Sequence, residues 1–160
     1  MRHICVMSNV RADGAKRPFS QTLRRLKDAG LRPTRQRLAL GKILFDAGDC
    51  HITAEQLHDE AISQGIKVSL ATVYNTLNQF TDTGLLREVV VSPGRSYFDT
   101  NINEHHHFFF EDDGALKDIP HDAIELARLP DAPSDAEVTR VDVIVRLRRA
   151  GDNRFQKIKL

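Results

Sequence analysis

The residues with the clearest capacity for chemistry are three consecutive histidines, His105, His106 and His107, preceded by Glu104. Imidazoles and carboxylates bind transition metals, and imidazoles also bind haem iron. The aromatic run 108–110 follows directly and predicts a buried strand. Because successive side chains of a strand point to opposite faces, His105 and His107 would share one face and Glu104 and His106 the other. Taken alone, the cluster leaves a metal or haem site, a solvated loop tip and an expression artefact all open.

Composition and charge limit the class of protein. The chain has 160 residues, of which 41% are hydrophobic and 28% charged, and this suits one ordinary domain or two small ones. A net charge of +1 excludes a protein that is basic throughout, although local basic clusters remain. The two cysteines, Cys5 and Cys50, form neither a disulfide framework nor a CxxC pair. No apolar run approaches the roughly 20 residues that span a bilayer, and residues 1–18 lack the apolar core of a signal peptide. We therefore expect a cytoplasmic protein that makes no membrane contact.

The elements that must position the histidines begin with four short helices. Each has a capping residue before it and a glycine just past its end, as helix termini prefer. The expected caps are Ser20, Thr34, Thr53 and Ser69, and the expected stops are Gly30, Gly48, Gly65 and Gly84. Apolar residues at helical spacing predict the core-facing stripes of the last three helices. These stripes are Leu40, Ile43 and Leu44; Ala54, Leu57, Ala61 and Ile62; and Leu70, Val73, Leu77 and Phe80.

After the fourth helix the pattern becomes that of strands. Residues 86–91 predict a strand, 92–94 a turn and 96–99 the returning strand. Helices followed by a hairpin are typical of a winged helix-turn-helix, in which the fourth helix is the recognition helix. For each polar residue of this surface, an ordinary solvated face is the alternative to DNA contact. The residues expected to contact double-stranded DNA are Arg35, Thr72, Tyr74, Asn75, Thr76 and Arg95, with Gln79 on the same helix face.

The remaining residues predict a small α/β domain. The histidine strand is followed by a turn at 112–114, a returning strand at 115–119, a short helix from Pro120 to Leu129 and an amphipathic strand over 141–147. A sheet of about three strands with one helix buries little surface alone, so we expect pairing with a second copy of the chain. The predicted class is α+β. Its parts are a flexible arm (1–19), a winged-helix domain (20–99), a hinge (100–103), a dimerisation and metal- or haem-sensing domain (104–150) and a tail (151–160).

Three segments resemble the ferric uptake regulator (Fur) family, in the same order along the chain: residues 50–55 (CHITAE), residues 69–78 (SLATVYNTLN) and the histidine strand. Within the family, the histidine strand and residues 138–147 look like the iron response regulator (Irr) subgroup of alphaproteobacteria. The resemblance implies a dimeric or larger transcription factor that binds iron-control elements in promoters of haem-synthesis and iron-handling genes. It would act when iron is limiting and be inactivated by haem. A zinc- or peroxide-sensing repressor of the same family is the alternative.

An enzyme is not expected, because no HExxH pair, phosphate loop or nucleophile motif accompanies the histidines.

The resemblance also implies two ligand sites. The regulatory metal site would be His51, Asp99, His105, His107 and Asp118, a set suited to Fe(II), Mn(II) or Zn(II). A second set, for metal or haem, would be Glu104, His106 and Glu125. A ligand bound across the hinge would change the angle between the two domains and so the reach of the recognition helices, and we expect haem to oppose DNA binding.

The chain also departs from the family pattern in four respects. Phe110 and Asp113 occupy the positions of the CxxC pair that holds a structural zinc. Val141 or a neighbouring residue stands where the second site would have a histidine, and Asn75 replaces a basic residue that often follows the tyrosine. A Cys-Pro haem regulatory motif is absent from the sequence.

Overall fold

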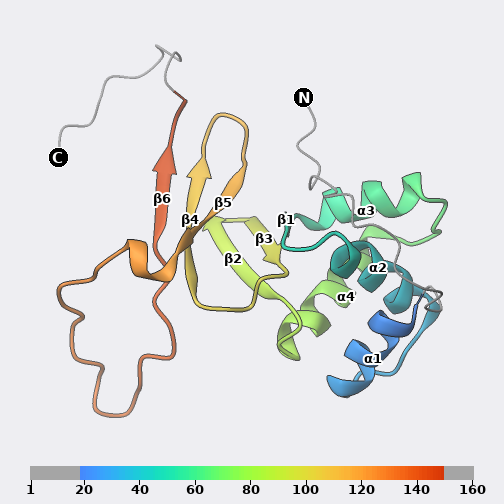
Figure 1. Ribbon diagram of the computed structural model, residues 1–160, viewed down its shortest axis with the longest axis horizontal. Coiled ribbons are helices and arrows are strands. Elements are labelled where there is room, and N and C mark those ends of the chain that lie inside the picture. The colour runs from blue at the N-terminus through green and yellow to red at the C-terminus, as the bar shows by residue number, and fades with distance from the viewer. Residues whose placement is uncertain (1–18, 150–160) are drawn as a thin grey trace. The chain divides into compact units, whose positions relative to one another are not determined.

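The computed structural model describes residues 19–149, so the expected tail, and the expected arm apart from Phe19, lie outside the described residues. The chain divides into two compact units after Ile102. In chain order (Figure 1), the first unit contains α1 (Ser20–Asp28), α2 (Arg35–Asp46), β1 (His51–Ile52), α3 (Ala54–Ser63), α4 (Leu70–Asp82), β2 (Arg87–Ser92) and β3 (Arg95–Asp99). The second contains β4 (His105–Phe110), β5 (Leu116–Pro120), the 3-10 turn η1 (His121–Ala123) and β6 (Ile144–Leu147).

Three of the four helices begin where their sequences predict. Thr34, Thr53 and Ser69 precede α2, α3 and α4 with extended backbones, and each side chain accepts a hydrogen bond from the backbone N–H three residues on. Thr53 and Gln56 complete a reciprocal capping box. The prediction for α1 was wrong, because Ser20 is the first residue inside the helix and Phe19 precedes it without a side-chain cap.

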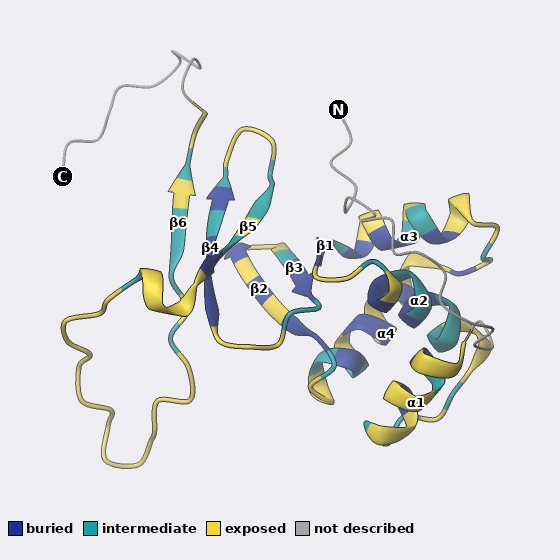
Figure 2. Cartoon of the chain, viewed as in Figure 1, coloured by how far each residue is buried: buried dark blue, intermediate teal, exposed yellow. Residues whose placement is uncertain are grey.

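The helices of the first unit share one apolar core, seen as the dark inner faces of α2, α3 and α4 in Figure 2. Leu40, Leu57 and Phe80 are fully buried in it, as their stripes predict. The prediction of core positions was wrong for two residues, because Ile62 is 51% exposed and Leu70 is 37% exposed. Adjacent residues of a helix lie about 100° apart around its axis, so the inward position of Ala61 turns Ile62 away from the core. Leu70 is the first residue of α4 and lies beyond the core.

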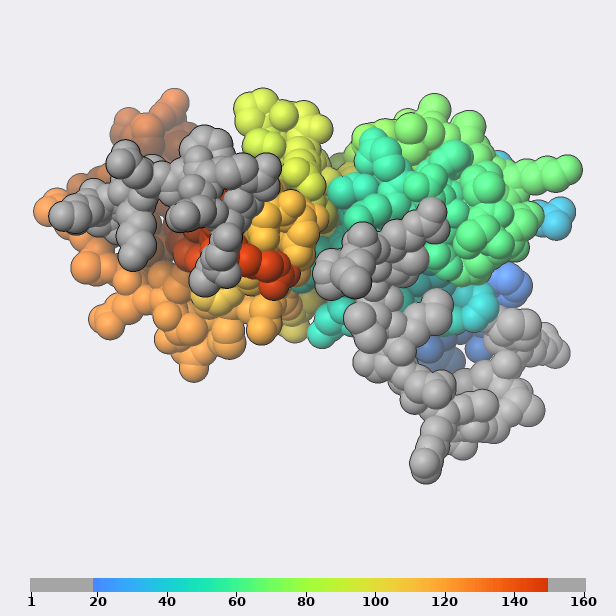
Figure 3. Space-filling model, turned by 90° about the horizontal axis from the view of Figure 1, so that it is seen from above, coloured from blue at the N-terminus to red at the C-terminus, as the bar shows by residue number. Residues whose placement is uncertain are grey.

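The end of α4 leads directly into a β-hairpin. Gly84 has a φ of 74°, and the N–H groups of Gly84 and Leu85 donate to the carbonyls of Thr81 and Phe80 at 3.0 and 2.8 Å. Strands β2 and β3 then pair antiparallel, and β1 pairs with the other side of β3, giving the order β1-β3-β2. Figure 3 shows the hairpin tip in yellow-green, standing out from the helices of its unit. Helices followed by this hairpin form the predicted winged helix.

The second unit has a three-stranded sheet in the order β5-β4-β6. Strand β4 pairs antiparallel with β5 and parallel with β6. Because β5 and β6 lie on opposite sides of β4, the long connection 121–143 is needed to join them. The helix expected from Pro120 to Leu129 was wrong, since only η1 forms there. Short helices depend on packing of an apolar face, and Leu126 and Leu129 are both exposed. The strand expected over 141–147 is shorter, beginning at Ile144.

Charged groups connect the end of β6 to the β4–β5 turn, at the corner that contains Phe110 and Asp113. The Arg148 Nε donates to Glu111 at 2.9 Å, and Arg149 donates to Asp113 at 2.7 Å. The Arg149 guanidinium also lies 4.6 Å from the centre of the Phe110 ring. Exposed ion pairs are screened by salt, so this corner is held by contacts that depend on ionic strength.

Within the described residues, no helix combines the length and apolar character needed to cross a membrane.

Candidate metal and DNA-binding sites

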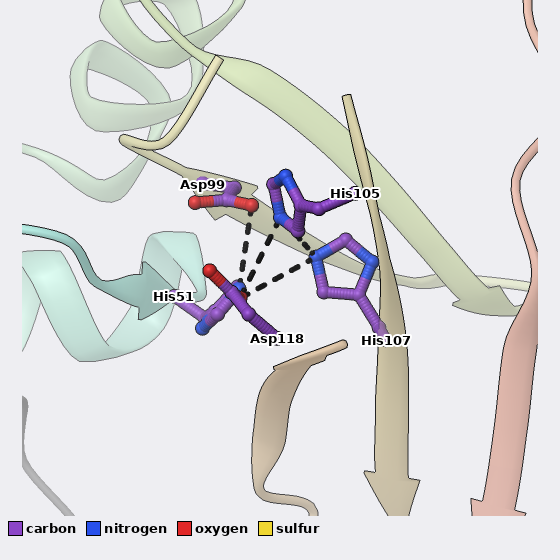
Figure 4. Close-up of side chains that lie close together, drawn as sticks. All are labelled: His51, Asp99, His105, His107 and Asp118. Carbon is purple, nitrogen blue, oxygen red and sulfur yellow. Dashed lines mark hydrogen bonds and ion pairs between the residues drawn. The ribbon is translucent and has the colours of Figure 1, made fainter. Parts of the chain in front are cut away.

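One imidazole–carboxylate pair lies on the sheet of the first unit (Figure 4). His51 of β1 is directly opposite Asp99 of β3, and its Nε2 is 3.3 Å from the Asp99 Oδ2. Asp99 is completely buried, and its Oδ1 accepts a hydrogen bond from the backbone N–H of Asn101 at 2.8 Å. The Thr100 hydroxyl accepts from the Cys50 N–H at 2.9 Å and donates to the Gly48 carbonyl at 3.0 Å, which fixes β1 beside β3. The pair is therefore oriented by backbone contacts.

A second donor group lies on the sheet of the other unit. His105 and His107 project from the same face of β4, as strand periodicity predicts, and their Nε2 atoms are 2.9 Å apart. Asp118 of β5 is directly opposite His107, and its Oδ1 lies 3.5 Å from the His105 Nε2 and 3.9 Å from the His107 Nε2. Both histidines are buried. Two buried imidazoles and one half-buried carboxylate with convergent donor atoms have the composition of a divalent metal site.

The protonation of His105 favours metal binding. Its Nδ1 is 2.7 Å from the backbone carbonyl of Asn103, which can only accept a hydrogen bond. Neutral His105 therefore carries its proton on Nδ1, and its Nε2 is left with the lone pair that a metal needs. With this tautomer, the same lone pair accepts a hydrogen bond from the Nε2–H of His107, whose Nε2 is 2.9 Å away.

The second predicted set is not brought together. Glu104, His106 and Glu125 do not form a cluster of donor atoms among the described residues. Glu104 and Glu125 are exposed and lie outside helices and strands, because the helix expected to carry Glu125 does not form. His106 is buried, and its Nδ1 accepts a hydrogen bond from the Val143 N–H at 3.4 Å. This contact occupies the Nδ1 lone pair and leaves the proton of the neutral ring on Nε2.

The recognition helix α4 exposes part of the predicted DNA-contacting set. Tyr74 and Asn75 are exposed, and Thr72 is half-buried with its hydroxyl 2.9 Å from that of the capping Ser69. Thr76 was predicted on the outer face, but it is only 4% exposed. It lies next to Leu77 and one turn after Val73, so helix geometry turns its small side chain toward the core. Arg35 and Arg95, from α2 and the hairpin, are both exposed.

Two contacts that hold the recognition helix were missed by the sequence analysis. The Tyr74 hydroxyl donates to Glu55 of α3 at 2.5 Å. The Nε and Nη2 of Arg37 donate to the Gln79 side-chain oxygen at 2.9 and 2.6 Å, and its Nη1 donates to the Arg32 carbonyl at 2.7 Å. The Gln79 oxygen is therefore used within the protein, although its helix position predicts DNA contact. The local sequence pattern does not predict these pairs, because their members are 19 and 42 residues apart in the chain.

The Tyr74–Glu55 contact changes the acidity of both groups. The hydrogen bond with Glu55 raises the pKa of Tyr74 above its ordinary value of 10.0, and the Tyr74 hydroxyl lowers the pKa of Glu55 below 4.5. The raised tyrosine pKa contributes stability below pH 10 that is lost as the pH rises through the folded pKa. The lowered glutamate pKa contributes stability above pH 4.5 that is lost as the pH falls through the folded pKa.

We expect Glu55→Gln to return the Tyr74 pKa toward its ordinary value, because a neutral amide does not oppose phenolate formation as a carboxylate does. Ultraviolet absorbance during an alkaline titration measures this change. The chain has two tyrosines, so the titration of Tyr74→Phe supplies the contribution of Tyr97 to be subtracted. Identical Tyr74 titrations with and without the carboxylate would show that the contact does not persist in solution.

The fold and these donor groups define a class: a winged-helix protein carrying imidazole and carboxylate groups suited to divalent metals. The chain belongs to the Ferric uptake regulator family, whose model matches residues 28–145. Proteins of this family are transcription regulators rather than enzymes, and they bind DNA and act as dimers.

Individual relatives agree with this assignment. The ferric uptake regulation protein of Klebsiella pneumoniae is 37% identical over 102 residues, covering 63% of this chain and 66% of the relative. The chain thus spans about two thirds of that relative's length. The ferric uptake regulator structure from Vibrio cholerae has a TM-score of 0.63 and 25% identity, covering 80% of this chain and 99% of that one. The Pseudomonas aeruginosa structure, with manganese, has a TM-score of 0.59 and 22% identity, covering 80% and 97%. These structures confirm the predicted α+β fold.

Proposed function

We propose that this protein is a homodimeric transcriptional regulator of promoter DNA, controlled by Fe(II), Mn(II) or Zn(II). The bound metal would be held by His51, Asp99, His105, His107 and Asp118. The observation that carries the proposal is the contact of the buried His105 Nδ1 with the Asn103 carbonyl, which leaves the Nε2 lone pair directed toward His107 and Asp118. Membership of the family supplies the link to DNA.

A single ion held by both donor groups explains how metal would control DNA binding. Asp99 and His105 are separated by six positions, which an extended chain spans in at most about 20 Å. A metal taking donors from both units would favour the arrangement of units that satisfies its coordination, and would shift the population toward it. A dimer reads successive half-sites about 34 Å apart, so the arrangement of the units would decide whether both recognition helices reach them.

We further infer an Irr-like response to iron and haem. The protein would bind iron-control elements of haem-synthesis and iron-homeostasis genes when iron is limiting, and haem would inactivate it. The support is the histidine strand, whose imidazoles suit haem iron and which continues into three phenylalanines. Because the Cys-Pro motif is absent, haem would act through imidazoles. A regulator of promoters would work in the cytoplasm, where bacterial DNA lies.

A zinc-sensing repressor is the second candidate function. The lone pair on the His105 Nε2 and the neighbouring carboxylate suit Zn(II) as well as Fe(II). Tight stoichiometric zinc binding without a haem response would favour it. A peroxide-sensing repressor is the related alternative within the family.

A DNA-binding titration tests the proposal. Duplexes selected from a random pool by the purified protein serve as probes, and their affinity is measured by fluorescence anisotropy with chelator, Mn(II), Zn(II) or haem. We expect divalent metal to change the affinity at least tenfold, haem to weaken it, and added haem to produce a shifted Soret band. Affinity that is unchanged by every ligand would contradict the proposed function. Sedimentation of the same samples distinguishes a dimer from a higher oligomer.

A further inference from the structure

We infer that Arg87 tunes the affinity of the metal site by supplying a permanent positive charge beside Asp99. This inference rests on the proposed metal binding. The strand order β1-β3-β2 places Asp99 between two neighbours. His51 is directly opposite it on one side, and Arg87 is directly opposite it on the other. The three residues therefore form one row across the sheet of the first unit.

The row lies on the buried face of the sheet. Along β2, Arg87, Val89 and Val91 are buried, while Glu88 and Val90 are exposed. Residues directly opposite one another in antiparallel strands share a face, with Cβ atoms about 5 Å apart. The Arg87 side chain therefore starts beside the Asp99 side chain and lies on the same face.

The burial of Arg87 is unusual enough to need a reason. It is 6% exposed, and arginine is almost never so buried unless its charge is compensated. Asp99, its neighbour in the row, has no exposed surface. A guanidinium remains protonated at any pH that a folded protein tolerates. Arg87 therefore offers the Asp99 carboxylate a fixed counter-charge that does not depend on a bound metal.

This charge has opposite effects on the two states of the site. Without metal, it stabilises the buried Asp99 carboxylate. With a divalent cation on His51 and Asp99, it repels a charge of the same sign in a buried region where solvent and salt screen little. Arg87 therefore lowers metal affinity and stabilises the metal-free protein. A regulator with Arg87 therefore releases its metal at a higher free metal concentration than a protein with the same donor set but without this arginine.

The test compares Arg87→Gln and Arg87→Lys in the full chain. Mn(II) affinity is measured by isothermal titration calorimetry, and the melting temperature of the chelator-treated protein by circular dichroism. We expect Arg87→Gln to bind Mn(II) at least tenfold more tightly and to melt at a lower temperature without metal. Arg87→Lys keeps a cationic side chain at this position and should bind Mn(II) less tightly than Arg87→Gln. Arg24→Gln removes the same charge from the exposed surface of α1, and should leave Mn(II) affinity unaltered.

Each outcome has a defined meaning. Equal Mn(II) affinity in Arg87→Gln and the unchanged chain would overturn the inference while leaving the proposed function intact. Absence of Mn(II) binding by the unchanged chain would contradict the proposed function, and the inference with it. If Arg87→Gln does not fold without metal, Mn(II) should restore its circular dichroism spectrum, because the cation replaces the missing charge. Failure of Mn(II) to do so would also overturn the inference.

Discussion

Joint replacement of His105 and His107 by alanine is expected to abolish the response of DNA affinity to divalent metal. Changing a single outer contact of a metal ligand typically weakens binding by about 10- to 100-fold, and this variant removes two proposed ligands themselves. Metal affinity should therefore fall by more than about 100-fold, as measured by competition with a chelating dye. Affinity for the selected duplex should equal that of the metal-free protein, whether or not Mn(II) is added.

His121→Ala is the matched control for that experiment. His121 is an exposed histidine of the same unit, outside the proposed donor set. We expect metal affinity and the DNA response to remain as in the unchanged chain. Circular dichroism of the double variant establishes that β4 still folds after the loss of two buried rings. A folded double variant that responds fully to metal would place the sensor elsewhere in the protein.

Phe80→Ala is expected to cause the largest loss of stability. Phe80 is fully buried near the end of α4, and its ring lies 5.8 Å from that of Phe45. Truncating a buried phenylalanine costs about 3–5 kcal/mol, out of a total stability of about 5–15 kcal/mol for a typical domain. Urea unfolding followed by circular dichroism should therefore show a much lower midpoint. DNA binding should weaken in parallel, because α4 carries most of the residues expected to contact DNA.

Leu70→Ala tests whether that effect comes from burial. Leu70 belongs to the same apolar stripe in the sequence, but it is 37% exposed at the start of α4. We expect the free energy of unfolding to fall by less than about 1 kcal/mol, since the variant removes less buried apolar surface than Phe80→Ala does. Similar losses for the two variants would contradict the assignment of Phe80 to the core and of Leu70 to its edge.

Under the proposed metal control, the donor groups have a fixed orientation and a compensated charge before any metal binds. The Asn103 carbonyl orients His105, and the Asn101 N–H orients Asp99. In our inference, Arg87, which is directly opposite Asp99, balances the Asp99 charge. Donor groups that are already oriented lose little conformational entropy when an ion binds. The counter-charge acts in the other direction, so geometry and charge set the binding strength separately.

Much of the fold was predictable because its signals are local. Thr34, Thr53 and Ser69 each satisfy backbone N–H groups within three residues of themselves. The alternation of a strand requires only neighbouring residues, and it correctly put His105 and His107 on one face. The winged-helix order follows from the change of period after α4. These features depend on the chain within one turn or one strand, so the sequence carries them in full.

Only the tertiary structure decided which residues meet across the chain and which short segments hold their shape. Residues 120–129 have a helical pattern but no apolar partner, so the helix does not form. Thr76 is polar, yet the packing of α4 turns it inward. Glu55 reaches Tyr74, and Arg87 lies in the row of His51 and Asp99, through the packing of helices and the register of strands. Such contacts depend on the relative placement of distant segments, for which a single sequence provides no local signal.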